Sequence, residues 1–175
     1  MIVKSKAFLC CLAALILLIP AVSIFPQSYE TLLSLLVDLP GYSGEEPEGM
    51  DVSSSDLKAV SVSREYSKGE SELHAGILVG QQSAGVWNPG YQEGLKMETP
   101  EGLMEVKGEG GFLVFHSYNK KKQEGMIAVL LDKGGADGGG GAVFVFAYKG
   151  IDNNEGLSLA KKFDWKKIKA KTQGL

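Results

Sequence analysis

The body of this chain lacks cysteine. Only Cys10 and Cys11 are present among the 175 residues, and both lie in an apolar stretch near the start. A lipoprotein signal would have its cysteine at the end of such a stretch, so we do not expect lipidation. Everything after residue 11 is without a thiol. This excludes disulfides, thiolate catalysis and zinc or iron–sulfur sites held by cysteine in the rest of the chain.

Histidine is almost as scarce, and neither histidine belongs to a recognisable catalytic or metal-binding motif. His74 and His116 are the only two, and neither has an Asp or Glu at metal-ligand spacing. Ser117 beside His116 is no hydrolase signal, because neighbours in a strand point to opposite faces. The Gly-rich run at 134–141 lacks the Gly-Lys-Ser/Thr ending of a phosphate loop, and its single Asp offers too few oxygens for calcium. We predict a flexible strand connection there, and no catalytic residue, metal site or cofactor.

Positive charge is in short supply but unevenly placed. The chain has 18 Lys and Arg against 21 Asp and Glu, which argues against general nucleic-acid binding. Acidic residues gather at 45–51, where we expect a solvated loop. Six lysines crowd residues 161–171. They could simply complement a helix dipole. They are also candidates for contact with anionic lipid or envelope polymer, and Lys166, Lys167 and Lys169 are the predicted envelope-binding residues.

The first 25 residues have the order of a bacterial-type export signal. Lys4 and Lys6 precede an uncharged run at 7–25 that ends near the small residues Ala21-Val22-Ser23. Cleavage near Ser23 is the favoured interpretation, and an uncleaved anchor is the alternative, since 19 residues nearly span a bilayer. Both place the rest of the chain outside the cytoplasm, in the periplasm or beyond the cell, and the second leaves it tethered to the membrane.

Beyond this segment, the hydrophobic pattern predicts one α+β domain. Residues 29–39 have a short amphipathic helical pattern, whereas 41–55 is acidic and rich in Gly, Ser and Pro, so we expect 41–55 to be flexible or loosely attached. Residues 24–56 then comprise this amphipathic segment and the acidic flexible stretch, and 57–175 form the single domain. Alternating apolar residues predict a hairpin of 58–67 with 71–79, and further strands at 103–107, 111–118, 126–131 and 142–148. The spacing of apolar residues predicts a helix over residues 157–168, with Phe163 on its buried side. The expected architecture is an antiparallel sheet of five to seven strands with this C-terminal helix packed across it.

Aromatic residues supply the candidate ligand site. Trp87 and Tyr91 lie in a segment, residues 81–94, that is interrupted by glycines and a proline, and Phe112 lies on a predicted strand. They could line a ligand cleft, and we name Trp87, Tyr91 and Phe112 as the candidate ligand-binding residues. The alternative is that Trp87 and Tyr91 anchor a loop.

The order of several short motifs resembles small, uncharacterised bacterial exported proteins. The motifs are Leu39-Pro40-Gly41-Tyr42, Ser63-Arg64-Glu65-Tyr66, Gly111-Phe112 with Tyr118, the apolar run at 142–148, and the ending at 159–168. At the level of fold alone, the order of strands and helix is similar to PsbP-like domains and, more distantly, to LolA-like lipid carriers. The resemblance implies an exported α+β domain and no particular activity.

Three function classes follow from this sequence. The first is a non-catalytic exported module that binds a protein or envelope component. The second is a carrier of a lipid or other apolar ligand, whose cavity would be lined by the apolar strands at 126–131 and 143–146. The third is an enzyme built on carboxylates and a histidine. We favour the first, because no catalytic set is recognisable.

Overall fold

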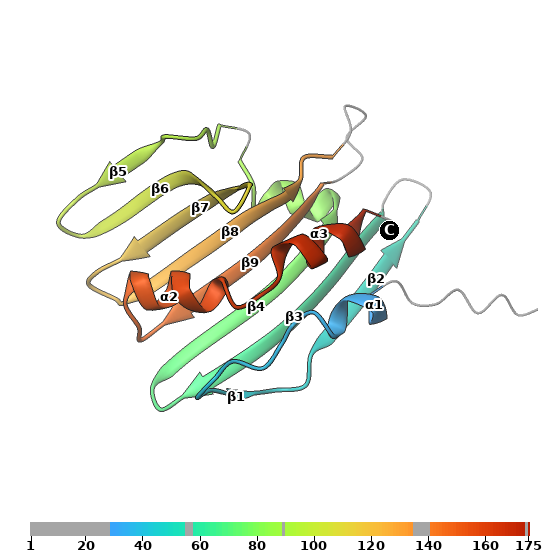
Figure 1. Ribbon diagram of the computed structural model, residues 1–175, viewed down its shortest axis with the longest axis horizontal. Coiled ribbons are helices and arrows are strands. Elements are labelled where there is room, and N and C mark those ends of the chain that lie inside the picture. The colour runs from blue at the N-terminus through green and yellow to red at the C-terminus, as the bar shows by residue number, and fades with distance from the viewer. Residues whose placement is uncertain (1–28, 55–57, 89, 135–140, 174) are drawn as a thin grey trace, which may run out of the picture.

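The computed structural model describes residues 29–54, 58–88, 90–134, 141–173 and 175 (Figure 1). The segment that predicts export lies outside the described residues, as do residues 135–140 of the Gly-rich run. The strands are β1 (Ser43–Gly44), β2 (Glu48–Ser53), β3 (Lys58–Lys68), β4 (Ser71–Gly80), β5 (Lys96–Glu98), β6 (Gly102–Glu109), β7 (Phe112–Asn119), β8 (Glu124–Asp132) and β9 (Ala142–Lys149). The helices are α1 (Glu30–Leu33), the 3-10 helix η1 (Gln81–Gly85), α2 (Asn153–Ala160) and α3 (Trp165–Thr172).

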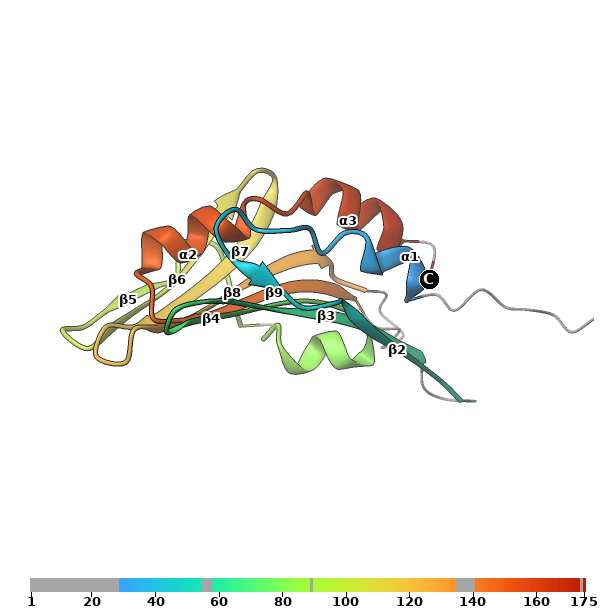
Figure 2. The same cartoon turned by 90° about the horizontal axis from the view of Figure 1, so that it is seen from below.

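One antiparallel sheet organises the domain. Its strand order is β1-β3-β4-β9-β8-β7-β6-β5, with β2 also paired to β3. The predicted hairpin is β3 with β4, and β5 to β9 form a second run of neighbouring strands that returns to pair β9 with β4. Figure 2 shows α1, α2 and α3 on one face of the sheet, which we call the helix face. The short green helix η1 lies against the opposite face, which we call the open face.

The expected α+β class is confirmed, but the strand count is not. The sheet has nine strands rather than five to seven. The additional ones include β1, with two residues, and β5, with three, while β2 has exposed side chains along most of its length. Strands that bury few side chains leave no apolar alternation in the sequence, because backbone pairing alone holds them.

The loose attachment expected for residues 41–55 is wrong for its described part. All six residues of β2 pair with β3, from Glu48 opposite Ser63 to Ser53 opposite Lys58. The preceding segment is fixed as well, because Leu32, Leu35, Leu36 and Leu39 are buried in the main core. Residues 29–54 therefore belong to the same folded unit as the rest of the described chain, and the expected boundary at 57 is corrected.

The single C-terminal helix is replaced by two short helices. Asp152 caps α2 by accepting hydrogen bonds from the backbone N–H groups of Asn154 and Glu155. The chain then turns at residues 161–164, and Asp164 caps α3 by accepting from the N–H of Lys167. A second N-cap within one apparent helical pattern is the local reason for the break, since an Asp side chain competes for the first-turn N–H groups.

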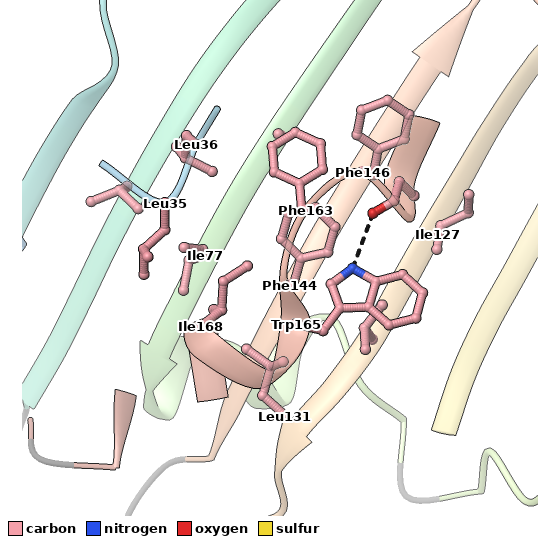
Figure 3. Packing of buried hydrophobic residues seen from close by; sticks show 14 of the residues in the cluster. Leu35, Leu36, Ile77, Ile127, Leu131, Phe144, Phe146, Phe163, Trp165 and Ile168 are labelled. Carbon is pink, nitrogen blue, oxygen red and sulfur yellow. Dashed lines mark hydrogen bonds between the residues drawn. The ribbon is translucent and has the colours of Figure 1, made fainter. Parts of the chain in front are cut away.

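The main core fills the space between the sheet and the helices. Figure 3 shows Phe163 and Trp165, from the turn and the start of α3, packed on the side chains of β8 and β9. Phe163 is 3% exposed, and its ring lies 4.9 Å from that of Phe144 and 5.9 Å from that of Phe146. The expected burial of Phe163 against the sheet is confirmed, although this residue lies between two helices. A smaller cluster on the open face contains Val106, Phe115, Ala128 and Val143.

Candidate binding surfaces

The three predicted ligand-binding aromatics do not form one cleft. On the open face, Tyr91 stacks on Phe115 with ring centroids 4.3 Å apart, and Trp87 meets the edge of Tyr91 at 5.6 Å. Phe112 belongs to the helix face, where its ring meets that of Trp165 at 6.0 Å. Phe112 and Phe115 are three residues apart in one strand, so their side chains project to opposite sides. In this structure Trp87 and Tyr91 attach residues 81–88 and 90–94 to the open face.

Phe112 instead comes together with two of the predicted envelope-binding lysines. A pocket of about 420 Å³ on the helix face lies between the β6–β7 turn and the α2–α3 junction. Phe112, Phe163 and Trp165 provide its aromatic residues, and its charged lining is Lys161, Lys162, Lys166, Glu109 and Asp164. The Nζ of Lys169 lies 5.9 Å from the centre of the Phe112 ring. We call this set the basic pocket; Lys167 does not line it.

The break between the two helices builds this pocket. Trp165 is 7% exposed, and its indole N–H donates to the carbonyl oxygen of Ala160 at 3.1 Å, which fixes the ring beside the turn (Figure 3). Lys161 forms an ion pair with Glu109 at 3.1 Å, joining the C-cap of α2 to the end of β6. The ammonium groups of Lys162 and Lys166 have no ion pair within the described chain. They are available to an anion outside the protein.

The two histidines lie in different environments. His116, on the helix face, is 2% exposed, and its Nε2 lies 2.8 Å from the Tyr148 hydroxyl. Burial lowers its pKa to about 4, against the opposing pull of the nearby Glu105 carboxylate. The Nδ1 of His116 is 3.9 Å from Glu105, beyond hydrogen-bond reach. A buried, neutral imidazole held by a tyrosine is suited to packing rather than to proton transfer with a substrate.

His74 lies on the open face and is accessible. Its Nδ1 is 2.6 Å from a carboxylate oxygen of Glu65 on the neighbouring strand. This pair was missed from the sequence, although the signal was present: in the predicted hairpin, the register that places Lys68 opposite Ser71 also places Glu65 opposite His74. Across the described ranges there is no group of three His, Cys, Asp or Glu side chains that could hold a metal ion.

No protein-family model, no curated protein and no solved structure matches this chain. The resemblance to exported proteins and to PsbP-like or LolA-like domains stays a prediction. In the part of the chain that the structure describes, no helix combines the length and apolar character needed to cross a bilayer.

A second surface was missed from the sequence. Strand pairing places Met97 opposite Met104, Met104 opposite Ser117, and Ser117 opposite Met126. The same row continues through Ala147 to His74. These residues are scattered over more than 70 positions of the sequence, so only the register could have revealed the row. It lies on the open face, because Ser117 shares the side of β7 that carries Phe115.

Proposed function

We propose that this protein is an exported, non-catalytic domain that binds an anionic phospholipid of the cell envelope through the basic pocket. The observation that carries the proposal is the convergence of Lys162, Lys166 and Lys169 on an aromatic floor at the α2–α3 junction. Lys162 lies in the turn after α2, and Lys166 and Lys169 lie in α3, so their common location depends on the break between the two helices.

The chemistry of the pocket suits a phospholipid head group. Each lysine near an anionic membrane surface contributes about 1 kcal/mol of binding free energy at moderate salt. The aromatic floor adds apolar contact for the glycerol and upper acyl region, and Trp is favoured at such an interface. Asp164 and Glu109 offset part of the charge, so we expect moderate, salt-sensitive affinity.

The alternative of an apolar-ligand carrier has less support. It required the strands at 126–131 and 143–146 to line a cavity. Ile127, Val129, Phe144 and Phe146 from these strands are 0% exposed in the main core. Phe163 packs on the rings of Phe144 and Phe146. Side chains therefore occupy the space where the ligand would have to lie.

The enzyme alternative has less support for a different reason. It needed a histidine and a carboxylate in hydrogen-bond reach within a cleft. His116 is buried and bonded to Tyr148. His74 does meet Glu65, but both side chains are largely exposed, at 41% and 57%. An exposed pair of this kind lacks the water-excluded surroundings in which acid–base groups gain catalytic strength.

Vesicle binding by two double variants of equal charge tests the proposal. K166Q/K169Q removes Lys166 of the pocket lining and Lys169 over the Phe112 ring, whereas K167Q/K171Q removes two lysines of α3 that neither line the pocket nor lie over this ring. In co-sedimentation with phosphatidylglycerol vesicles, we expect the first variant to lose roughly 30-fold in partitioning, from about 2 kcal/mol for two lysines. The second should lose clearly less, and zwitterionic vesicles should bind neither variant nor the unmodified chain by this route.

Equal losses in the two variants would contradict the pocket and indicate diffuse electrostatic attraction. Unchanged binding in K166Q/K169Q would contradict the proposal altogether. Circular dichroism of each variant checks that the fold persists, as we expect for exposed lysines.

A further inference from the structure

The methionine row on the open face lies in an elongated trough. Two adjoining pockets, of about 440 and 340 Å³, share Glu124 and Gly125 and together cross the sheet from β5 to β3. Met97, Met104 and Met126 line the first, and His74 and Ala147 line the second. We call the two pockets together the methionine trough.

The trough is apolar along its middle and acidic at its rim. Met97 is 58% exposed, and Met104 and Met126 are half-buried. Four glutamates line the trough, Glu65, Glu72, Glu101 and Glu124, against one lysine, Lys149. Lys149 is paired with Glu72 and His74 with Glu65. The carboxylates of Glu101 and Glu124 have no ion pair in the described part of the chain.

We propose that the methionine trough binds a cationic amphipathic helix of a partner protein. Methionine side chains are flexible and polarizable, so they adapt to apolar residues of varied shape. The unpaired glutamates complement lysine or arginine on the flanks of such a helix, and charge complementarity selects it over an acidic or neutral segment. An anionic ligand, such as the phospholipid proposed for the basic pocket, would be repelled here.

The dimensions fit this occupant. The trough crosses seven strands, so six spacings of about 4.8 Å give a length of about 29 Å. A helix with a rise of 1.5 Å per residue covers that length with about 19 residues. Residues 81–88 and 90–94, held to the open face by Trp87 and Tyr91, lie beside the row and limit the exposed surface on that side.

Binding of model peptides to the full chain tests the proposal. A labelled 18-residue peptide of leucine and lysine, with its leucines on one helical face, is titrated and followed by fluorescence anisotropy. A peptide of identical composition, with leucines spread around the helix, is the control. We expect the amphipathic peptide to bind at least tenfold more tightly, and its affinity to fall as salt is raised.

A matched pair of variants locates the peptide. M97Q/E124Q changes the trough, whereas M50Q/E48Q makes the same two replacements on β2, where Met50 is 54% exposed and outside the trough. We expect at least a tenfold loss of affinity in the first and less than twofold in the second. Similar losses in both, or equal binding of the two peptides, would overturn the proposal.

The lysine variant K166Q/K169Q keeps the trough intact and should bind the peptide within twofold of the unmodified chain. Failure of the phospholipid proposal would therefore leave this result unaffected. A large loss of peptide binding in K166Q/K169Q would place the peptide elsewhere and overturn the trough as its site.

Discussion

The hydroxyl oxygen of Tyr148 on β9 lies 2.8 Å from Nε2 of His116 on β7, so the tyrosine spans the strand between them. The residue of β8 opposite Tyr148 is Gly125, and any side chain there would overlap the Tyr148 ring. Gly156 of α2 also faces this ring and leaves room for it. Two glycines thus let one tyrosine pack between sheet and helix while it satisfies a buried histidine.

The burial of His116 predicts a pH-dependent stability. The pKa of His116 falls from its usual 6.5 to about 4 in the folded protein, chiefly because burial disfavours the charged ring. The native state therefore binds fewer protons than the unfolded state between these values. The stability contributed by the neutral ring is fully present above about pH 6.5 and is lost as the pH falls from 6.5 through 4. Near pH 4 the loss of unfolding free energy amounts to about 3 kcal/mol.

Urea unfolding at pH 7.5 and pH 4 measures this effect by difference. H116Q removes the titrating ring, so the unmodified protein should lose about 3 kcal/mol more than H116Q between the two pH values. H74Q also removes one imidazole but leaves His116 in place, so it serves as the control and should keep the His116 contribution of about 3 kcal/mol. An identical pH dependence in H116Q and the unmodified chain would mean that His116 is protonated without cost in the native state.

Gly125 should not tolerate even a methyl group. G125A places a carbon against the ring of Tyr148, and overpacking of this kind costs roughly 1–3 kcal/mol. G85A is the matched control, since an added methyl at Gly85 meets open space and should be neutral or slightly stabilising. Urea denaturation at neutral pH compares the two. Equal stabilities would show that Tyr148 moves aside freely.

Much of the fold follows from the sequence because burial leaves periodic marks. Apolar residues alternate with polar ones in β3 and β4 and form continuous runs in β8 and β9, as the burial of these strands requires. All four strands were predicted close to their observed bounds. By contrast, β2 and β5 are held by backbone pairing and bury little. At Asp164 the chain either continues one helix or starts a second helix, with the Asp164 side chain accepting from the N–H of Lys167. Hydrophobic periodicity does not distinguish these two possibilities.

The candidate surfaces were predicted less well for a related reason. Phe112, Lys166 and Lys169 were named, but their convergence depends on the α2–α3 junction. Trp87 and Tyr91 were predicted to share a cleft with Phe112. They pack instead on Phe115, which is three residues further along β7 and therefore projects to the opposite face from Phe112. The methionine row depends on the register of β5 to β8 and leaves no local signal.

Arg64 should hold residues 29–45 to the sheet. Its guanidinium donates to the carbonyl oxygens of Leu36 and Glu45, each at 2.7 Å, and to the carboxylate of Asp38 at 2.6 Å. Hydrogen bonds from a charged donor are worth about 1.5–3 kcal/mol each when well protected. Because part of this site is exposed, we expect R64M to cost about 2–3 kcal/mol in total.

Limited proteolysis shows which segment is destabilised in R64M. Chymotrypsin should cut R64M first within residues 29–42, where Tyr29, Leu32 and Leu36 become accessible. K58M, on the same strand but without a side-chain hydrogen bond or ion pair within the described residues, should resist like the unmodified chain. First cuts elsewhere in R64M would mean that burial of the leucines suffices to hold this segment.

Phe163 should be the most costly residue of the α2–α3 junction to truncate. Its ring packs against Phe144 and Phe146 of β9 and against Tyr66 of β3, so it joins the turn to core side chains of two strands. F163A should cost about 3–5 kcal/mol, the usual range for a buried phenylalanine. D164A, next to it, removes only the cap of α3 and should cost about 1 kcal/mol. Thermal and urea unfolding of both variants test the order.

Because the basic pocket is built on this turn, F163A should also weaken vesicle binding, whereas D164A removes a carboxylate from the pocket lining and should strengthen it. Opposite effects on stability and binding in D164A would separate the structural role of the turn from its role in the pocket, and a parallel loss of both would contradict the placement of the anion beside Asp164.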